Sequence, residues 1–233
     1  MVIRDPSLQR LVSIASALGS LRERVVFIGG AIAPILHSET VLPYSRPTHD
    51  VDAVLATHRY SDSADVGAEL RSLGFHQRAI PTAHVHRWLS ADGISFDLVP
   101  TGDHLGGIGG PWDDFTVNSS QRSFVDGVEL RHASSVAFLV MKIAAFADRG
   151  GDDPRMSHDV EDIVALSASR GSLVVEVAHA ENSARREVVN FTRSLVHSDA
   201  FHEILAAHLN NAIDPAEAER LARERFTEIA ALR

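Results

Sequence analysis

The chain has 233 residues, of which 45% are hydrophobic and 23% charged, enough for one large domain or two small ones. The absence of cysteine excludes disulfides, thiolate metal sites and cysteine nucleophiles. The net charge of -9 means that a nucleic-acid substrate needs a local basic patch or contact with a short polymer end only. The sequence shows no signal peptide and no apolar stretch near the ~20 residues that cross a bilayer. We therefore expect a cytoplasmic protein without a membrane partner.

The first part of the chain mixes helix and strand patterns. Residues 7–23 place hydrophobic side chains at helical spacing and predict a helix. The β-branched run 25–28 predicts a buried strand, which ends at Gly29-Gly30 and leads into a second helix. Residues 50–55 alternate between polar and apolar side chains, which is typical of another strand.

Further elements follow up to residue 132. Residues 61–73 predict a helix, and three further segments predict strands: 75–80, 85–91 and 94–99. The segment 100–120 is rich in Gly, Asp and Ser and predicts a long surface loop. Asp126-Gly127 is a two-residue hairpin signal between two short strands, 123–125 and 128–130.

From residue 133 onward the patterns are helical. The predicted helices are 134–148, 157–169, 173–180, 184–197, 199–209 and 215–231. Strands and helices are thus segregated along the chain, which favours the α+β class. We expect two domains, a mixed domain over 1–132 and a C-terminal helical domain over 133–233.

Two aspartates in the strand 50–55 carry the strongest chemical signal. Side chains two apart on a strand point to the same face, so Asp50 and Asp52 form an anionic pair that calls for a cation. Asp97 interrupts the apolar strand 94–99 and joins them if the two strands are neighbours. Carboxylate oxygens are preferred ligands of Mg²⁺, and Mn²⁺ suits them as well. The sequence therefore predicts a divalent-metal site of Asp50, Asp52 and Asp97.

Gly29 and Gly30 stand where the first strand turns into a helix. Glycine lets a backbone approach a phosphate closely, and the N-terminus of the following helix favours negative charge. No Gly-Lys-Ser/Thr sequence follows, so this is not a Walker A loop. A Gly-Gly turn about twenty residues before an Asp-x-Asp strand predicts a turn that contacts a triphosphate.

At these places the chain resembles the DNA polymerase β-type nucleotidyltransferase superfamily. The matching parts are residues 27–31, residues 46–52 and Asp97. The resemblance implies a polymerase β-like mixed sheet with flanking helices, three acidic metal ligands and an NTP as substrate. Gly30 stands where many members have serine, which leaves only backbone contacts to phosphate. Arg46 and Thr48 precede the acidic pair and are candidates for contact with the nucleotide or for rigidifying the loop.

The helical part is similar to AbiEii/AbiGii-type nucleotidyltransferases of toxin–antitoxin systems. That family carries a Lys-x-x-Ala helix with a downstream arginine and then an Asp-x-x-Asp helix, and Lys142, Arg149, Asp159 and Asp162 match these positions. The resemblance implies that Lys142 and Arg149 lie near the triphosphate and that Asp159 contributes to catalysis. A structural ion pair between Lys142 and Asp159 is about as probable, Arg149 also suits the end of its helix, and Asp162 is more often structural.

These observations together predict a metal-dependent nucleotidyltransferase that moves NMP from an NTP to an acceptor hydroxyl. The toxin-like resemblance implies an RNA end, such as tRNA, as acceptor and a cognate antitoxin as a possible partner. An antibiotic-type small-molecule acceptor suits the acidic charge better. A third alternative is a non-catalytic member of the fold that only binds a nucleotide or a partner protein.

Overall fold

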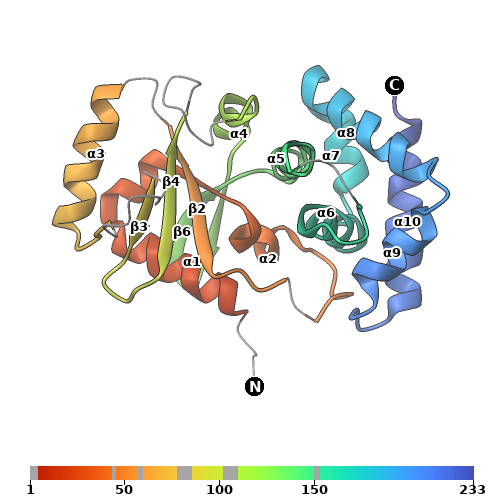
Figure 1. Cartoon of the computed structure of the whole chain (residues 1–233), viewed down its shortest axis with the longest axis horizontal. Helices are drawn as coiled ribbons and strands as arrows, with labels where there is room; N and C mark the ends of the chain where they lie inside the picture. Colours follow the sequence, from red (N-terminus) through yellow and green to blue (C-terminus); the bar gives the residue numbers. More distant parts are fainter. Residues whose placement is uncertain (1–4, 44–45, 57–59, 78–85, 102–109, 150–152) are drawn as a thin grey trace. The chain divides into compact units, whose positions relative to one another are not determined.

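Six strands form one mixed sheet in the order β3-β4-β2-β1-β6-β5 in the computed structural model (Figure 1). The strands are β1 Val25–Ile28, β2 Asp50–Leu55, β3 Arg87–Leu89, β4 Ser95–Pro100, β5 Gln121–Val125 and β6 Val128–His132. β1 pairs in parallel with β6, and β2 with β4, whereas β1–β2, β3–β4 and β5–β6 are antiparallel. The structure describes residues 5–43, 46–56, 60–77, 86–101, 110–149 and 153–233, without the side chains of 60–64.

The chain divides into two compact units, which are described separately. The first consists of Met1–Pro34 and Pro47–Ser134, and contains the sheet. The second consists of Ile35–Arg46 and Ser135–Arg233. The predicted domains 1–132 and 133–233 stay a prediction, and in the structure the short segment 35–46 is grouped with the C-terminal helices.

The first helix begins as predicted but ends earlier. In α1 (Pro6–Ala17) the Asp5 side chain accepts hydrogen bonds from the backbone N–H groups of Ser7 and Leu8 and so caps the N-terminus. The predicted extension to residue 23 is wrong, because Gly19 has a φ of +53° and residues Gly19–Arg24 form a 3₁₀ helix. α1 packs against β2 and β6.

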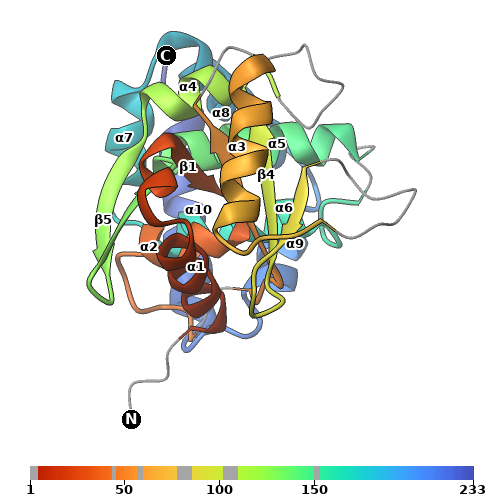
Figure 2. The same cartoon turned by 90° about the vertical axis from the view of Figure 1, so that its left-hand side faces the viewer.

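One face of the sheet is covered by α3 (Tyr60–Ser72), which Figure 2 shows in front of β4. Val51, Phe96 and Trp88 are register partners on β2, β4 and β3 and so lie on the same face. A Cβ at Gly67 of α3 would lie 3.7 Å from the Trp88 ring. Because side chains alternate along a strand, the neighbours of these residues, among them Asp50, Asp52 and Asp97, point to the opposite face.

Three predictions in this unit need correction or qualification. Residues 75–77 form no strand, and His76 makes only an isolated bridge to Leu89; residues 78–80 lie outside the described part. The strand predicted over 85–91 is shorter, at Arg87–Leu89. The predicted loop contains α4 (Asp113–Asn118), whose two first-turn aspartates suit the positive end of a helix, while residues 102–109 are not described.

The Asp126-Gly127 hairpin is confirmed. Asp126 has a φ of 49° and Gly127 a φ of 80°, and positive values at both central residues are the conformation that a tight two-residue turn requires. The turn joins β5 and β6 as an antiparallel pair.

The second unit contains the predicted series of helices. They are α5 Ser135–Asp148, α6 His158–Ser169, α7 Leu173–His179, α8 Asn182–Val196, α9 Phe201–Leu209 and α10 Pro215–Ala231. A short helix, α2 (Ala33–Leu36), leads into this unit. Arg225 donates hydrogen bonds to the carbonyls of Ser167 and Ala168 at the end of α6 and to both carboxylate oxygens of Glu39. In the described residues, no helix combines the length and the apolar character that a membrane crossing needs.

Candidate active site

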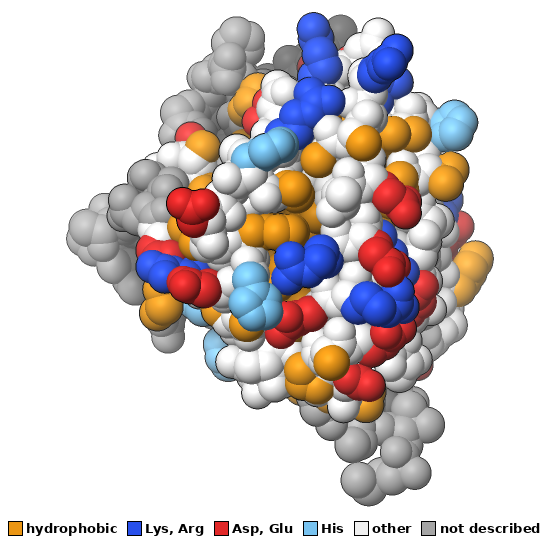
Figure 3. Space-filling model, turned by 90° about the vertical axis from the view of Figure 1, so that its right-hand side faces the viewer, with side chains coloured by type: hydrophobic (Ala, Val, Ile, Leu, Met, Phe, Trp, Pro, Cys, Tyr) orange, Lys and Arg blue, Asp and Glu red, His pale blue; other side chains and the backbone are white. Residues whose placement is uncertain are grey.

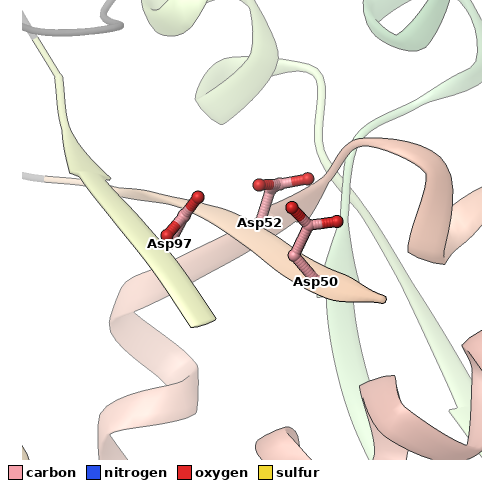
Figure 4. Close-up of side chains that lie close together, drawn as sticks. All are labelled: Asp50, Asp52 and Asp97. Atoms are coloured by element: carbon pink, nitrogen blue, oxygen red, sulfur yellow. The ribbon is translucent and has the colours of Figure 1, made fainter. Parts of the chain in front are cut away.

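Three carboxylates converge on one face of the sheet. Asp50 and Asp52 stand on β2, and Asp52 is the register partner of Asp97 on β4. Each side chain offers an oxygen within 4.8 Å of the others, and Figure 4 shows them projecting from the same side of the two strands. The neighbouring strands that the sequence analysis required are therefore present. The role of the three residues as metal ligands stays a prediction.

Thr48 positions the first of these carboxylates. Its hydroxyl donates a 2.8 Å hydrogen bond to Oδ1 of Asp50. Its backbone is held from α1, because its N–H donates to Oγ of Ser7 and its carbonyl accepts from Nη1 of Arg10. Thr48 was predicted to contact the nucleotide; in the structure its hydroxyl is directed at Asp50.

Gly29 provides the space that Asp52 occupies. Its backbone has a φ of 71° and a ψ of -168°, a region that is essentially restricted to glycine. A Cβ at this position would lie 2.3 Å from Oδ2 of Asp52. The glycine turn and the acidic strand, which the sequence analysis combined through their spacing of about twenty residues, are thus in direct contact in the structure. Gly30 follows as the buried first residue of a 3₁₀ helix.

Arg87 is a component of this cluster that the sequence analysis missed. Its Nε donates to Oδ1 of Asp97 over 2.8 Å and its Nη2 to Oδ2 over 2.5 Å, a bidentate pair. The same Nη2 lies 3.5 Å from Oδ2 of Asp50. The hydrogen bond to Asp97 is the largest cause that raises the pKa of Arg87 above its usual value, against the opposing effect of burial. A hairpin turn centred on residue 92 pairs 87 with 97, so this neighbour was accessible from the sequence.

The donor set fits a divalent cation that prefers oxygen ligands. Three carboxylates offer several oxygens at one point, as Mg²⁺ or Mn²⁺ requires. The guanidinium group of Arg87 lies against two of these carboxylates, which demonstrates that the cluster attracts positive charge. Asp50, Asp52 and Asp97 are the residues that would hold such an ion.

The remaining predicted residues form an ion-pair network within the second unit. Nζ of Lys142 lies 3.3 Å from Oδ1 of Asp159 and 2.5 Å from Oδ2 of Asp162. Arg149 forms an ion pair with Asp159, and Nη2 of Arg46 lies 3.4 Å from Asp162. The structure therefore brings together four of the predicted residues: Lys142, Arg149, Asp159 and Arg46. The ion pair between Lys142 and Asp159, which the sequence analysis gave as the structural alternative, is thus present in the structure.

A cavity lies beside this network. It has a volume of about 320 Å³, and its lining includes Arg149, Asp159, Phe146 and Met156. Met156 is 80% exposed. The cavity therefore combines apolar side chains with the Arg149–Asp159 pair, a second acidic residue, Asp153, and His158.

Comparison with known proteins identifies the fold. No protein-family model and no curated protein sequence matches this chain. Among solved structures, an antigenic nucleotidyltransferase-like protein from Paracoccidioides brasiliensis is similar, with a TM-score of 0.51 and 18% sequence identity over 92% of each chain. Together with the mixed sheet, this similarity confirms the predicted α+β class with a nucleotidyltransferase-like fold.

Proposed function

We propose that this protein is a metal-dependent nucleotidyltransferase that transfers NMP from an NTP to an acceptor hydroxyl. The observation that carries the proposal is the convergence of Asp50, Asp52 and Asp97 beside the Gly29 turn in a nucleotidyltransferase-like fold. In this proposal residues 1–132 are the catalytic domain and residues 133–233 are a helical domain.

The site residues of the first unit have distinct roles in this reaction. Asp50, Asp52 and Asp97 bind the divalent cation, Mg²⁺ or Mn²⁺, which when bound neutralises charge on the phosphates and increases the nucleophilicity of the acceptor oxygen. Thr48 orients Asp50 through its 2.8 Å hydrogen bond. We assign the backbone at Gly29 and Gly30 to the triphosphate, to which it would contribute N–H donors.

The reaction is a substitution at the α-phosphorus. The acceptor oxygen forms a bond to this phosphorus, and the bond between the phosphorus and the oxygen of the β-phosphate breaks. The electron pair of the broken bond leaves with pyrophosphate. The proton of the acceptor hydroxyl passes to a carboxylate, for which Asp97 is the candidate, or to water.

The second unit contributes residues whose roles are proposals. We assign Lys142 and Arg149 to the triphosphate, together with Arg46, and Asp159 to a supporting catalytic position, following the resemblance to AbiEii-type enzymes. Their ion pairs with acidic partners would then exchange for contacts with phosphate, for which a guanidinium or ammonium group is suited.

The acceptor is proposed to be an RNA end, with tRNA as the first candidate. The face drawn in Figure 3 carries acidic, basic and hydrophobic side chains interspersed. On α10, Arg220 is paired with Glu217 and Glu224. Interspersed charges favour contact with a short polymer end over a long phosphate backbone, and they also suit the small-molecule alternative. We also keep the proposal that a cognate antitoxin binds the acidic surface of this protein.

Transfer of label is the test of this function. Purified protein is incubated with each of the four α-labelled NTPs, Mg²⁺ or Mn²⁺, and total tRNA or a panel of hydroxyl-bearing small molecules. We expect wild type to label an acceptor and Asp52→Asn to lose at least about 10³-fold of the rate, in line with loss of charge stabilisation in an active site. Asp92→Asn, an exposed aspartate on the β3–β4 turn, is the matched control and keeps the wild-type rate.

The outcomes separate the alternatives. Label in a small molecule but not in RNA rejects the tRNA acceptor and keeps the nucleotidyltransferase. Label in no acceptor, combined with NTP binding by calorimetry that needs no divalent cation and persists in Asp52→Asn, rejects catalysis in favour of a nucleotide-binding protein.

A further inference from the structure

The contact between Arg87 and the three carboxylates has a consequence for metal binding. We propose that Arg87 competes with a divalent cation for Asp97, so that a cation bound on Asp97 must first displace the guanidinium group. This inference rests on the proposed function only in taking Asp50, Asp52 and Asp97 as metal ligands.

The geometry of the pair supports competition. Arg87 engages both oxygens of Asp97, through Nε at 2.8 Å and Nη2 at 2.5 Å. Mg²⁺ needs a carboxylate oxygen at about 2.0–2.1 Å, and any divalent cation on that carboxylate repels a guanidinium group at such short range. The Arg87 guanidinium group and a metal ion therefore cannot both bind Asp97 in this arrangement.

The competition acts unequally on the three ligands. Arg87 makes two hydrogen bonds to Asp97, whereas its distance to Oδ2 of Asp50 is 3.5 Å. A cation held mainly by Asp50 and Asp52 is consequently less affected than one that also needs Asp97. An ion held by Asp50 and Asp52 can therefore bind while the guanidinium group stays in place. An ion that also needs Asp97 binds only after the guanidinium group has moved.

Exposure identifies which partner moves. The side chain of Arg87 is 43% exposed, while that of Asp97 is 10% exposed. Asp97 is fixed within β4, where its backbone pairs with β2 and β3. An arginine at a solvent-facing position can rotate into water, where its charge is hydrated at little cost. Arg87 is therefore the displaceable partner and Asp97 the fixed one.

Mn²⁺ binding in the absence of nucleotide tests this inference. We titrate wild type and Arg87→Ala with Mn²⁺ and follow the free ion by electron paramagnetic resonance. Removal of the competing cation is expected to lower the half-saturating Mn²⁺ concentration about two- to fivefold, the scale of one partly exposed ion pair. Arg87→Lys keeps the charge but not the bidentate contact, and we expect an intermediate value.

Two controls give the test its specificity. Arg122→Ala removes an arginine of β5 that pairs with Glu129, and it leaves Mn²⁺ binding unchanged. In an Asp97→Asn background, Arg87→Ala is expected to bring a clearly smaller gain in affinity, because the contested ligand is gone and only the longer contact of Arg87 with Asp50 remains.

A purely structural role of Arg87 predicts the opposite change in Mn²⁺ affinity. If the guanidinium group only holds Asp97 in place for the ion, Arg87→Ala binds Mn²⁺ more weakly, and this result or an unchanged affinity overturns the inference. Thermal unfolding adds a second readout: without Mn²⁺ the variant melts below wild type, and saturating Mn²⁺ raises its Tm more than that of wild type.

The outcome is distinguishable from failure of the proposed function. A wild-type protein that labels no acceptor, while Arg87→Ala binds Mn²⁺ more tightly, rejects the nucleotidyltransferase and keeps the competition. A protein that transfers nucleotide, with Mn²⁺ affinity unaffected by Arg87→Ala, keeps the function and rejects the competition.

Discussion

The carboxylate of Asp52 lies where the side chain of residue 29 would stand if that residue were not glycine. A Cβ on Gly29 would approach Oδ2 of Asp52 to 2.3 Å, and the backbone of Gly29 adopts a φ of 71°. A contact this short is not tolerated by packed atoms. The identity of residue 29 is therefore linked to the position of Asp52 even before any contribution of its backbone to phosphate binding.

Gly29→Ala is predicted to displace Asp52 and abolish transfer. We expect a loss of about 3 kcal/mol in the free energy of unfolding, because the backbone conformation is restricted to glycine. Nucleotide transfer is expected to fall at least about 10²-fold, the scale of a misplaced catalytic group. Urea unfolding and the label-transfer assay measure the two effects.

Gly74→Ala is the matched control for this prediction. Gly74 has a φ of 87°, but a Cβ there would meet nothing within 4 Å. The Gly74→Ala substitution should therefore lower the free energy of unfolding by about 1 kcal/mol and leave nucleotide transfer intact. Equal effects of the two substitutions on transfer would contradict a specific link between Gly29 and Asp52.

Thr48→Val is predicted to slow transfer without unfolding the protein. Valine has the shape of threonine but removes the 2.8 Å hydrogen bond to Asp50, so the carboxylate loses its orientation. We expect about a tenfold lower kcat and about 1 kcal/mol less stability. Thr48→Ser, which keeps the hydroxyl, should retain activity. A rise in KM for the nucleotide at constant kcat would instead favour the direct nucleotide contact predicted from the sequence.

Lys142→Met is predicted to destabilise the second unit. The Lys142 side chain is 13% exposed and its ammonium group pairs with Asp159 and Asp162, so its removal leaves two buried carboxylates without this partner. We expect a loss of about 3 kcal/mol in chemical denaturation. Arg220→Ala removes a cation from exposed ion pairs and should leave the midpoint unchanged.

A triple variant separates structure from phosphate binding at Lys142. Neutralising the partners as well, in Lys142→Met/Asp159→Asn/Asp162→Asn, should restore part of the lost stability, because the buried carboxylates no longer carry charge. The recovery is only partial, because Arg149 and Arg46 lose their ion pairs with these two residues. A Lys142→Met protein that keeps wild-type stability but has a raised KM for the nucleotide would show that the ammonium group acts mainly on substrate.

Glu176 is predicted to make stability depend on acidic pH. Burial opposes its ionisation, but hydrogen bonds from Arg170, Ser135 and Ser172 outweigh burial and hold its pKa below the usual 4.5. A carboxyl group whose pKa is lower in the folded state stabilises the protein above its unfolded pKa, and this contribution is lost as pH falls through the folded value. Wild type should therefore lose stability below about pH 4.5.

Urea unfolding as a function of pH measures this effect. Glu176→Gln should reduce the slope of stability against pH in the acidic range, whereas Glu228→Gln, at an exposed position of α10, should leave it as in wild type. Parallel curves for wild type and Glu176→Gln would contradict the assignment.

Local patterns were sufficient for most elements of this fold. The alternation in β2 placed Asp50 and Asp52 on one face, and the helical spacing after residue 133 predicted α5 to α10. The Asp126-Gly127 turn specified its hairpin because both residues tolerate positive φ. The early end of α1 was missed, because a single glycine in the left-handed region outweighed the favourable spacing of the residues around it.

The sequence by itself determined the acidic strand, the glycine turn before it and the division between strand-rich and helical parts, because these depend on periodicities of two or 3.6 residues within short segments. Only the tertiary structure decided that Asp97 stands beside Asp52 and that Gly29 makes room for Asp52. Those relationships depend on which strands are neighbours and in which register. That choice is made by packing between segments far apart in the chain, which no local pattern records.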